Sequence, residues 1–371
     1  MPEPTLPPPT LLVFPINVDS AIPITRTAKM LGFRIIGASS VLPHSQLPEL
    51  DTCIHLPFIT ESTFNRSFAT ALRQHRVTYV LAPHHGVWSH LETLSQTFPF
   101  ILCGEHPFEQ NWNNFQASRE WGVNMHRDVF ASLVAPAGSQ AAWPLSMAEY
   151  ASIHRGFLRI PGESDVEKLE ALCAIARLVP PGDVVEIGSL YGRSAYALGR
   201  LAHAHGIGST LCIDPWRTDA LIDQGHQASI INQGIRRIDL ERVFQEFLST
   251  AAEVPGMSYI RKPSCEALED YVAAGACGSL RAPELPDVSI RGRISLLHID
   301  GNHRYDEVLR DIQTWTPLLA EGGWLLLDDY VWAFGDGPKI AGDKLLATSG
   351  FDLSFTCSDT LFLRKAESGE N

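Results

Sequence analysis

A buried strand that runs directly into a glycine-punctuated turn and then into a helix is the feature that most constrains this chain. The segment Val184–Ser194 reads V-V-E-I-G-S-L-Y-G-R-S. Gly188 and Gly192 permit tight turning and close approach of a ligand to the backbone. The first amides of the following helix can donate hydrogen bonds to that ligand. The segment therefore predicts a loop that cradles a nucleotide or nucleoside.

The spacing of this loop, E-x-G-x-x-x-G-x-S, narrows the choice of ligand. It matches neither the dinucleotide fingerprint G-x-G-x-x-G nor the phosphate-loop pattern G-x-x-x-x-G-K-[ST]. The next apolar run, T-L-C-I-D, ends in Asp214, where doubly wound sheets usually hold a ribose diol. A nucleoside without a phosphate tail fits both the glycine loop and the acid at Asp214. The alternative is another kind of doubly wound nucleotide-binding protein.

Motifs further along the chain connect this loop to a known family. The loop and I-D-P-W at 213–216 are followed by L-H-I-D-G-N-H-R-Y at 297–305 and G-G-W-L-L-L-D-D-Y at 322–330. Over about residues 145–365 the chain resembles class I S-adenosylmethionine (SAM)-dependent methyltransferases, and within them the macrocin-type, metal-dependent O-methyltransferases. The resemblance implies an α/β, Rossmann-like sheet, SAM as methyl donor, and a hydroxyl of a sugar or glycosylated small molecule as acceptor.

The resemblance also assigns roles around the cofactor. Glu186 serves the methionine end or orders its loop, Ser194 binds the methionine carboxylate, and Asp214 binds the ribose. Trp216 either stacks on the adenine or packs as an ordinary surface residue. Ser264 either borders the adenine or caps its helix. The predicted cofactor-binding residues are Glu186, Gly188, Ser189, Gly192, Ser194, Asp214, Trp216 and Ser264.

Acidic residues end two neighbouring strands of the predicted sheet. Asp300 ends the fourth strand, and Asp328 and Asp329 end the fifth. Parallel strands deliver their last residues to the same edge, where three carboxylates repel one another unless a cation or protons compensate. Mg²⁺ suits such oxygen ligands, and the matching acids of the resembled family hold an ion. A helix cap or a solvated acidic edge is the alternative.

The predicted general base follows the first of these acids. Many members of the resembled family carry a second acid at the position of Asn302, so that role passes to His303. A metal-bound hydroxyl is more acidic than a free one, and a neutral imidazole can take its proton. A helix-opening histidine bonded to backbone is the alternative for His303. His298, inside the strand, is read as a buried core histidine.

Composition excludes several classes of partner. A formal charge of −13 without a basic run argues against nucleic acid. Seven scattered cysteines without a C-x-x-C pair indicate reduced thiols, and no apolar stretch is long enough to span a bilayer. We expect a cytoplasmic enzyme that takes a small-molecule acceptor, binds neither nucleic acid nor membrane, and assembles as a homo-oligomer.

The chain divides into three predicted parts. Residues 1–106 alternate between short strands and helices, which predicts a small α/β domain with a parallel sheet. Its segment D-T-C-I-H-L-P-F-I at 51–59 resembles the N-terminal subdomain of ATP-grasp enzymes, but the lysine-bearing loops of a complete ATP-grasp fold have no room, and we infer no ATP binding. Residues 107–160 are a linker or lid, and residues 161–371 are the methyltransferase domain.

Two other functions fit the same residues. One keeps the fold and SAM but methylates an amine or other small molecule without a metal, so that the acids bind the amine or order loops. The other is a non-catalytic nucleoside-binding scaffold. EDTA sensitivity separates the first from a metal enzyme, and an acceptor panel tests the second.

Overall fold

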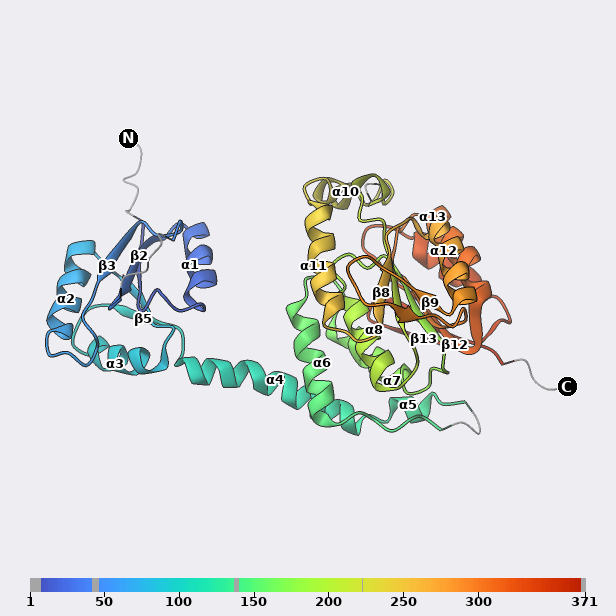
Figure 1. Ribbon diagram of the computed structural model, residues 1–371, viewed down its shortest axis with the longest axis horizontal. Coiled ribbons are helices and arrows are strands. Elements are labelled where there is room, and N and C mark those ends of the chain that lie inside the picture. Colours follow the sequence, from blue (N-terminus) through green and yellow to red (C-terminus); the bar gives the residue numbers. More distant parts are fainter. Residues whose placement is uncertain (1–7, 42–46, 137–139, 222, 368–371) are drawn as a thin grey trace. The chain divides into compact units, whose positions relative to one another are not determined.

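The computed structural model describes residues 8–41, 47–136, 140–221 and 223–367 of the chain. The chain forms two compact units, Met1–Gln116 and Ala117–Asn371. Each unit has its own sheet and its own core, and each is described by itself below (Figure 1). None of the helices in the described ranges combines the length and apolar character needed to cross a membrane.

The first unit is a parallel sheet of five strands in the order β3-β2-β1-β4-β5. Its elements are β1 (Thr10–Val13), α1 (Ala21–Met30), β2 (Arg34–Ser39), β3 (Thr52–His55), α2 (Phe64–His75), β4 (Tyr79–Leu81), α3 (His85–Ser95) and β5 (Ile101–Cys103). Alternate side chains of a strand point to opposite faces. Leu12 accordingly packs with α2 and α3, while Leu11 and Val13 pack with α1.

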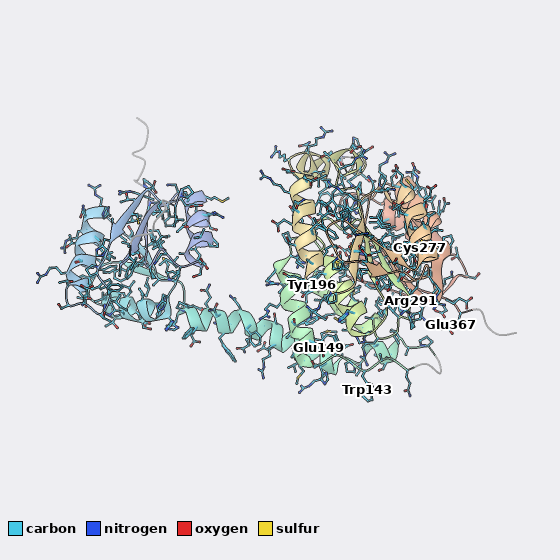
Figure 2. The ribbon with its side chains drawn as sticks, in the orientation of Figure 1. Trp143, Glu149, Tyr196, Cys277, Arg291 and Glu367 are labelled. Atoms are coloured by element: carbon cyan, nitrogen blue, oxygen red, sulfur yellow. The ribbon has the colours of Figure 1, made fainter. Side chains whose placement is uncertain are left out.

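Three helices occupy the segment that the sequence predicted as a linker or lid. They are α4 (Pro107–Arg127), α5 (Phe130–Leu133) and α6 (Met147–Arg159). Ser146 and Glu149 form a capping box at the start of α6. Trp121 and Tyr150 are buried in the core of the second unit, whereas Trp143, labelled in Figure 2, is 90% exposed.

The second unit is a seven-stranded sheet in the order β13-β14-β12-β11-β6-β7-β8, in which β14 runs antiparallel to both of its neighbours. Its strands are β6 (Asp183–Ile187), β7 (Thr210–Ile213), β8 (Met257–Ile260), β11 (Ile294–Ile299), β12 (Leu319–Leu327), β13 (Phe351–Cys357) and β14 (Thr360–Lys365). A separate two-stranded ribbon consists of β9 (Ser279–Leu280) and β10 (Val288–Ser289). This is the doubly wound, Rossmann-like sheet that the motifs predicted.

Helices cover both faces of the seven-stranded sheet (Figure 1). On one face, α6 is joined by α7 (Val166–Ile175), α8 (Arg193–Ala204) and α11 (Leu240–Ala252). On the other are α12 (Ser264–Cys277), α13 (Tyr305–Trp315) with its 3₁₀ extension η1 (Thr316–Leu318), and α14 (Gly337–Leu346). Figure 2 labels Tyr196 on α8 and Cys277 at the end of α12, one from each layer. The short helices α9 (Thr218–Leu221) and α10 (Ser229–Ile235) follow β7.

Side-chain caps set the boundaries of two helices. Asp165 caps α7 by accepting a hydrogen bond from the Lys168 amide. Helix α10 ends at Ile235 and α11 begins at Leu240, because the Asp239 carboxylate accepts hydrogen bonds from the amides of Glu241 and Arg242.

Candidate functional site

Two adjoining cavities open at the carboxyl edge of the large sheet, where its parallel strands end together. The aspartate cavity, of about 440 Å³, is lined by Asp300, Asp328, Asp329 and His303. The proline cavity, of about 460 Å³, lies toward β8 and α13 and is lined by residues that include Pro215 and Pro263. Both cavities share Gly188, Asp214, Leu221 and Gly301. One elongated ligand can therefore lie across both. None of the described residues of 107–160 lines either cavity.

Gly188 begins the predicted cofactor loop and adopts a left-handed conformation, with φ of +84°. Its Cβ, if present, would collide with the carbonyl oxygen of Asp300 and with the Cα of Gly301. The sequence explained this glycine by the approach of a ligand. The structure adds a different and sufficient cause, because the loop after β6 packs directly on the backbone that follows β11.

Replacing Gly188 by alanine should separate these two segments. We expect Gly188→Ala to lower the free energy of unfolding by about 1–3 kcal/mol through strain and collision, and to weaken S-adenosylhomocysteine (SAH) binding at least tenfold. Gly206→Ala is the control, because Gly206 also has positive φ, +66°, but a Cβ there meets no atom within 4 Å. Denaturant titration and calorimetry give the two quantities. Equal effects of both substitutions would contradict the collision.

Asp214 closes the same loop from the neighbouring strand. Its Oδ2 accepts hydrogen bonds from the amides of Ser189 and Leu190 at 3.1 and 3.0 Å, and its Oδ1 accepts one from the amide of Trp216 at 2.7 Å. The carboxylate is 2% exposed, and burial raises its pKa. Asp214 thus fixes the shape of the loop besides lining both cavities.

Trp216 does not reach either cavity, which corrects the predicted adenine contact. Its ring is 2% exposed and packs against Phe244 and Phe247, with centroids at 4.9 and 4.6 Å. Its indole nitrogen donates to the Leu190 carbonyl at 2.8 Å. The positive φ of Trp216, +43°, directs the side chain into the core rather than across the edge of the sheet.

The remaining predicted cofactor residues divide by whether they line a cavity. Ser189 and Ser194 line the aspartate cavity, and Ser264 lines the proline cavity. Glu186 is fully buried and accepts a hydrogen bond from the Ser189 hydroxyl at 2.6 Å, so it orders the loop. Gly192 lines neither cavity. It occupies the N-cap of α8 with a φ of +86°.

The predicted acids and base converge in the aspartate cavity. His303 Nε2 lies 2.6 Å from Asp329 Oδ2 and 3.9 Å from Asp300 Oδ1. Strand β12 ends at Leu327, and Asp329 adopts a positive φ of +52°, so both acids that follow the strand can reach the cluster. Burial opposes protonation of His303, but the two carboxylates outweigh it and raise its pKa to about 10. Burial and the charge of Asp328 raise the pKa of Asp300.

Lys168 is a charged member of this site that the sequence reading missed. Its ammonium lies 2.5 Å from Asp328 Oδ2, and its side chain is 1% exposed. The Thr360 hydroxyl from β14 donates to Asp328 Oδ1. Although burial opposes charge on both partners, the Lys168 ammonium keeps the pKa of Asp328 well below its usual range. The sequence signal was a lysine beside Leu169 on a helix that also carries Glu167 and Glu170.

His298 continues the buried polar chain toward the cofactor loop. Its Nδ1 lies 2.9 Å from Glu186 Oε1, and its Nε2 lies 3.7 Å from Asp328 Oδ2 without a hydrogen-bond partner. Burial and Lys168 oppose its protonation, yet Asp328 and Glu186 raise its pKa to about 9. The predicted core histidine is therefore buried, but one of its nitrogens faces the acids.

Aromatic and apolar side chains also line the aspartate cavity. The Trp332 ring lies 4.4 Å from the His303 ring, and Phe334 packs edge-on against Trp332 at 5.6 Å. Helix α10 contributes Ile231 and Ile235, one turn apart. The sequence motifs did not reveal this wall, because its residues lie after the last strand motif and in the short helix α10, outside every motif singled out above.

Arg193 is the one arginine or lysine among the described lining residues of the aspartate cavity. Its guanidinium lies over the Phe157 ring at 4.4 Å and donates to the Gly162 carbonyl at 2.7 Å. Its Nε is buried without a partner. A guanidinium beside the first turn of α8 is suited to a carboxylate, which makes Arg193 a candidate for the methionine carboxylate together with Ser194.

Comparison with known proteins identifies the class of this unit. Residues 185–330 match the model of a family described as "Methyltransferase domain". Similar solved structures include the O-methyltransferase NovP (16% identity, 68% of this chain and all of that chain, TM-score 0.41). Cofactor-bound Rv0187 from MTB is also similar, with 15% identity over 66% of this chain and 98% of that chain and a TM-score of 0.37. The calicheamicin methyltransferase CalS11 has 15% identity over 71% of this chain and 94% of that chain and a TM-score of 0.41. No curated protein matches the sequence.

The doubly wound sheet, the loop after β6 and the acid after β7 define a nucleoside-cofactor site at the edge of an α/β domain. With the family match across 185–330, the chain contains a class I SAM-dependent methyltransferase domain. This confirms the class I methyltransferase resemblance and the fold class predicted from the motifs, and it supports SAM as the methyl donor.

Proposed function

We propose that this protein is an O-methyltransferase that uses a divalent cation, Mg²⁺ above all, to methylate a hydroxyl of a sugar or glycosylated small molecule of secondary metabolism. The observation that carries the proposal is the meeting of Asp300, Asp329 and His303 beside the cofactor loop. A sulfonium donor is already activated. The protein's remaining tasks are to align the acceptor oxygen and to remove its proton.

The residues of the cluster fit a small oxygen-seeking cation. Ligand atoms of Asp300, His303 and Asp329 lie within 4.8 Å of one another, as do those of His298, Asp300 and Asp328. Mg²⁺ with ligands at about 2.0–2.1 Å can span such separations and keep positions for substrate oxygens. The Nε2 atom of His298 lies near Asp328 of the same cluster and is buried without a hydrogen-bond partner.

Each side chain then has a task of its own. Asp300 and Asp329 would hold the ion, which would supply acidity to the acceptor hydroxyl. Asp328, fixed by Lys168 and Thr360, completes the acidic edge. An ion bound to Asp300 and Asp329 would offset the two charges that raise the pKa of His303, so the imidazole would be neutral in the loaded enzyme and would accept the hydroxyl proton at Nε2. The Trp332 ring lies against the imidazole.

The lining of the aspartate cavity supports a neutral glycoside as acceptor. Trp332 and Phe334 offer flat aromatic faces beside His303, and the apolar face of α10 closes the wall. Besides the acids of the cluster, Glu163 and Asp359 line the cavity, whereas Arg193 is its one described arginine or lysine and faces the donor side. A phosphate-bearing acceptor would meet like charge there.

A metal-independent methyltransferase remains the second candidate, and one observation favours it. Lys168 already compensates Asp328 inside the cluster, so part of the negative charge needs no ion. The acids would then hold loops or an amine acceptor. EDTA separates the two functions directly.

The test is methyl transfer from tritiated SAM to a panel of p-nitrophenyl glycosides. We expect EDTA to stop transfer, Mg²⁺ to restore it, and Asp300→Asn to lower turnover at least 100-fold with SAH affinity changed less than threefold. Asp306→Asn, at an exposed acid on α13, is the control. Full transfer in EDTA would select the metal-independent enzyme. SAH binding without transfer to any hydroxyl or amine acceptor would select the non-catalytic scaffold.

A further inference from the structure

Asp300, Asp328 and Asp329 all line the aspartate cavity, but they differ in how far they are open to it. The Asp328 side chain is 8% exposed, whereas those of Asp300 and Asp329 are 24% and 17% exposed. We call Asp328 the inner acid and the other two the outer acids. A dissolved cation that enters the cavity therefore reaches the outer acids more easily than the inner one.

Both oxygens of the inner acid already have a hydrogen-bond donor. Asp328 Oδ2 accepts a charge-assisted hydrogen bond from the Lys168 ammonium at 2.5 Å, and Oδ1 accepts one from the Thr360 hydroxyl. His298 Nε2 approaches the same Oδ2 at 3.7 Å. A divalent ion on that oxygen would lie beside the buried positive charge of Lys168, and like charges repel at such range. The inner acid is therefore a poor ligand while Lys168 is present.

The outer acids have no such fixed cation. In the described ranges, neither Asp300 nor Asp329 forms an ion pair with a lysine or an arginine, and the imidazole of His303 lies beside both. Ligand atoms of these three residues lie within 4.8 Å of one another. Close carboxylates without a fixed cation favour the binding of a dissolved one. The negative charge that the site offers to an ion is therefore that of the outer acids.

We propose that Lys168 holds Asp328 as its own counter-ion and thereby sets how tightly the site binds a divalent cation, an inference that rests on the metal dependence proposed above. Asp300 and Asp329 alone would then hold the ion. Two carboxylates leave more positions of an octahedral ion for water and acceptor oxygens than three would. The positive charge behind the acids also weakens the binding of the ion. Lys168 does not line the cavity, so it is a positioning residue and not a catalytic one.

The experiment measures binding of Mn²⁺ to the full chain, without turnover, from the electron paramagnetic resonance signal of the free ion. We expect Lys168→Met to bind Mn²⁺ at least tenfold more tightly than the wild-type chain, because a positive charge beside the acids is removed. A purely structural role of Lys168 would not raise this affinity. Asp329→Asn should weaken binding at least tenfold. Lys339→Met removes an exposed lysine that pairs with Asp343 and should change the affinity less than threefold.

A double variant keeps the proposal testable if Lys168→Met alone is poorly folded. Lys168→Met combined with Asp328→Asn removes both charges of the buried pair and leaves the net charge of the site unchanged. Its Mn²⁺ affinity should stay within threefold of the wild-type value. A loss of tenfold or more would make Asp328 an ion ligand and overturn the assignment, as would unchanged or weaker binding by a folded Lys168→Met chain. A wild-type chain that binds no Mn²⁺ would instead overturn the metal dependence of the proposed function, and the assignment with it.

Discussion

His303→Ala should lower turnover by about 100- to 10,000-fold, the usual contribution of a positioned general base. In the proposed reaction Asp300 and Asp329 serve as anionic ligands, so the His303 imidazole is the side chain of the cluster that accepts the proton. Affinity for SAH should change less than threefold. Initial rates with tritiated SAM and calorimetry with SAH measure the two effects separately.

The controls for this variant distinguish lost chemistry from lost structure. His203→Ala changes an exposed histidine on α8 and should leave turnover unaltered. Added imidazole should restore part of the activity of His303→Ala, because a small base can occupy the space beside Trp332. Near-normal turnover of His303→Ala would remove the residue from the reaction and leave the proton to solvent.

Lys168→Met should cost about 3–5 kcal/mol in the free energy of unfolding, the range for removing one partner of a buried ion pair. Methionine fills the space of the lysine stem but leaves the Asp328 carboxylate buried without its counter-charge. Urea titration followed by circular dichroism measures the loss. It should be the largest effect of any single charged-to-neutral substitution discussed above.

Two comparisons isolate the cause of that loss. Lys339→Met removes an exposed partner of Asp343 and should cost less than about 1 kcal/mol. Adding Asp328→Asn to Lys168→Met removes the uncompensated charge and should recover most of the stability. If Lys168→Met cost no more than Lys339→Met, the buried pair would not stabilise the fold.

The sheet and its acidic edge could be predicted because they depend on local patterns. Apolar runs ending in Gly188, Asp214 and Asp300 identify parallel strands, and parallel strands bring their last residues together. The same reasoning placed His303 in the cluster. None of these inferences required knowledge of which distant segments pack against the edge.

The residues that were missed or misassigned depend on such distant contacts. Lys168 meets Asp328 across 160 positions of the chain, and Asp311 meets Ser264 across 47. Trp216 follows a strand as a cofactor residue would, but its backbone turns the ring into the core. Gly188 was singled out for the approach of a ligand to its backbone. Part of the reason, contact with the Asp300 carbonyl, appears only in three dimensions.

The position of Lys168 in the chain also bears on how this enzyme can be dissected. The segment that matches the methyltransferase family begins at residue 185, whereas Lys168 lies in α7, before that segment. A fragment that begins at residue 185 would contain all three aspartates and His303. It would lack Lys168, so the buried carboxylate of Asp328 would have lost its counter-charge. The smallest autonomous catalytic fragment, and any chimera that transplants it, must therefore start upstream of Asp165, which caps α7.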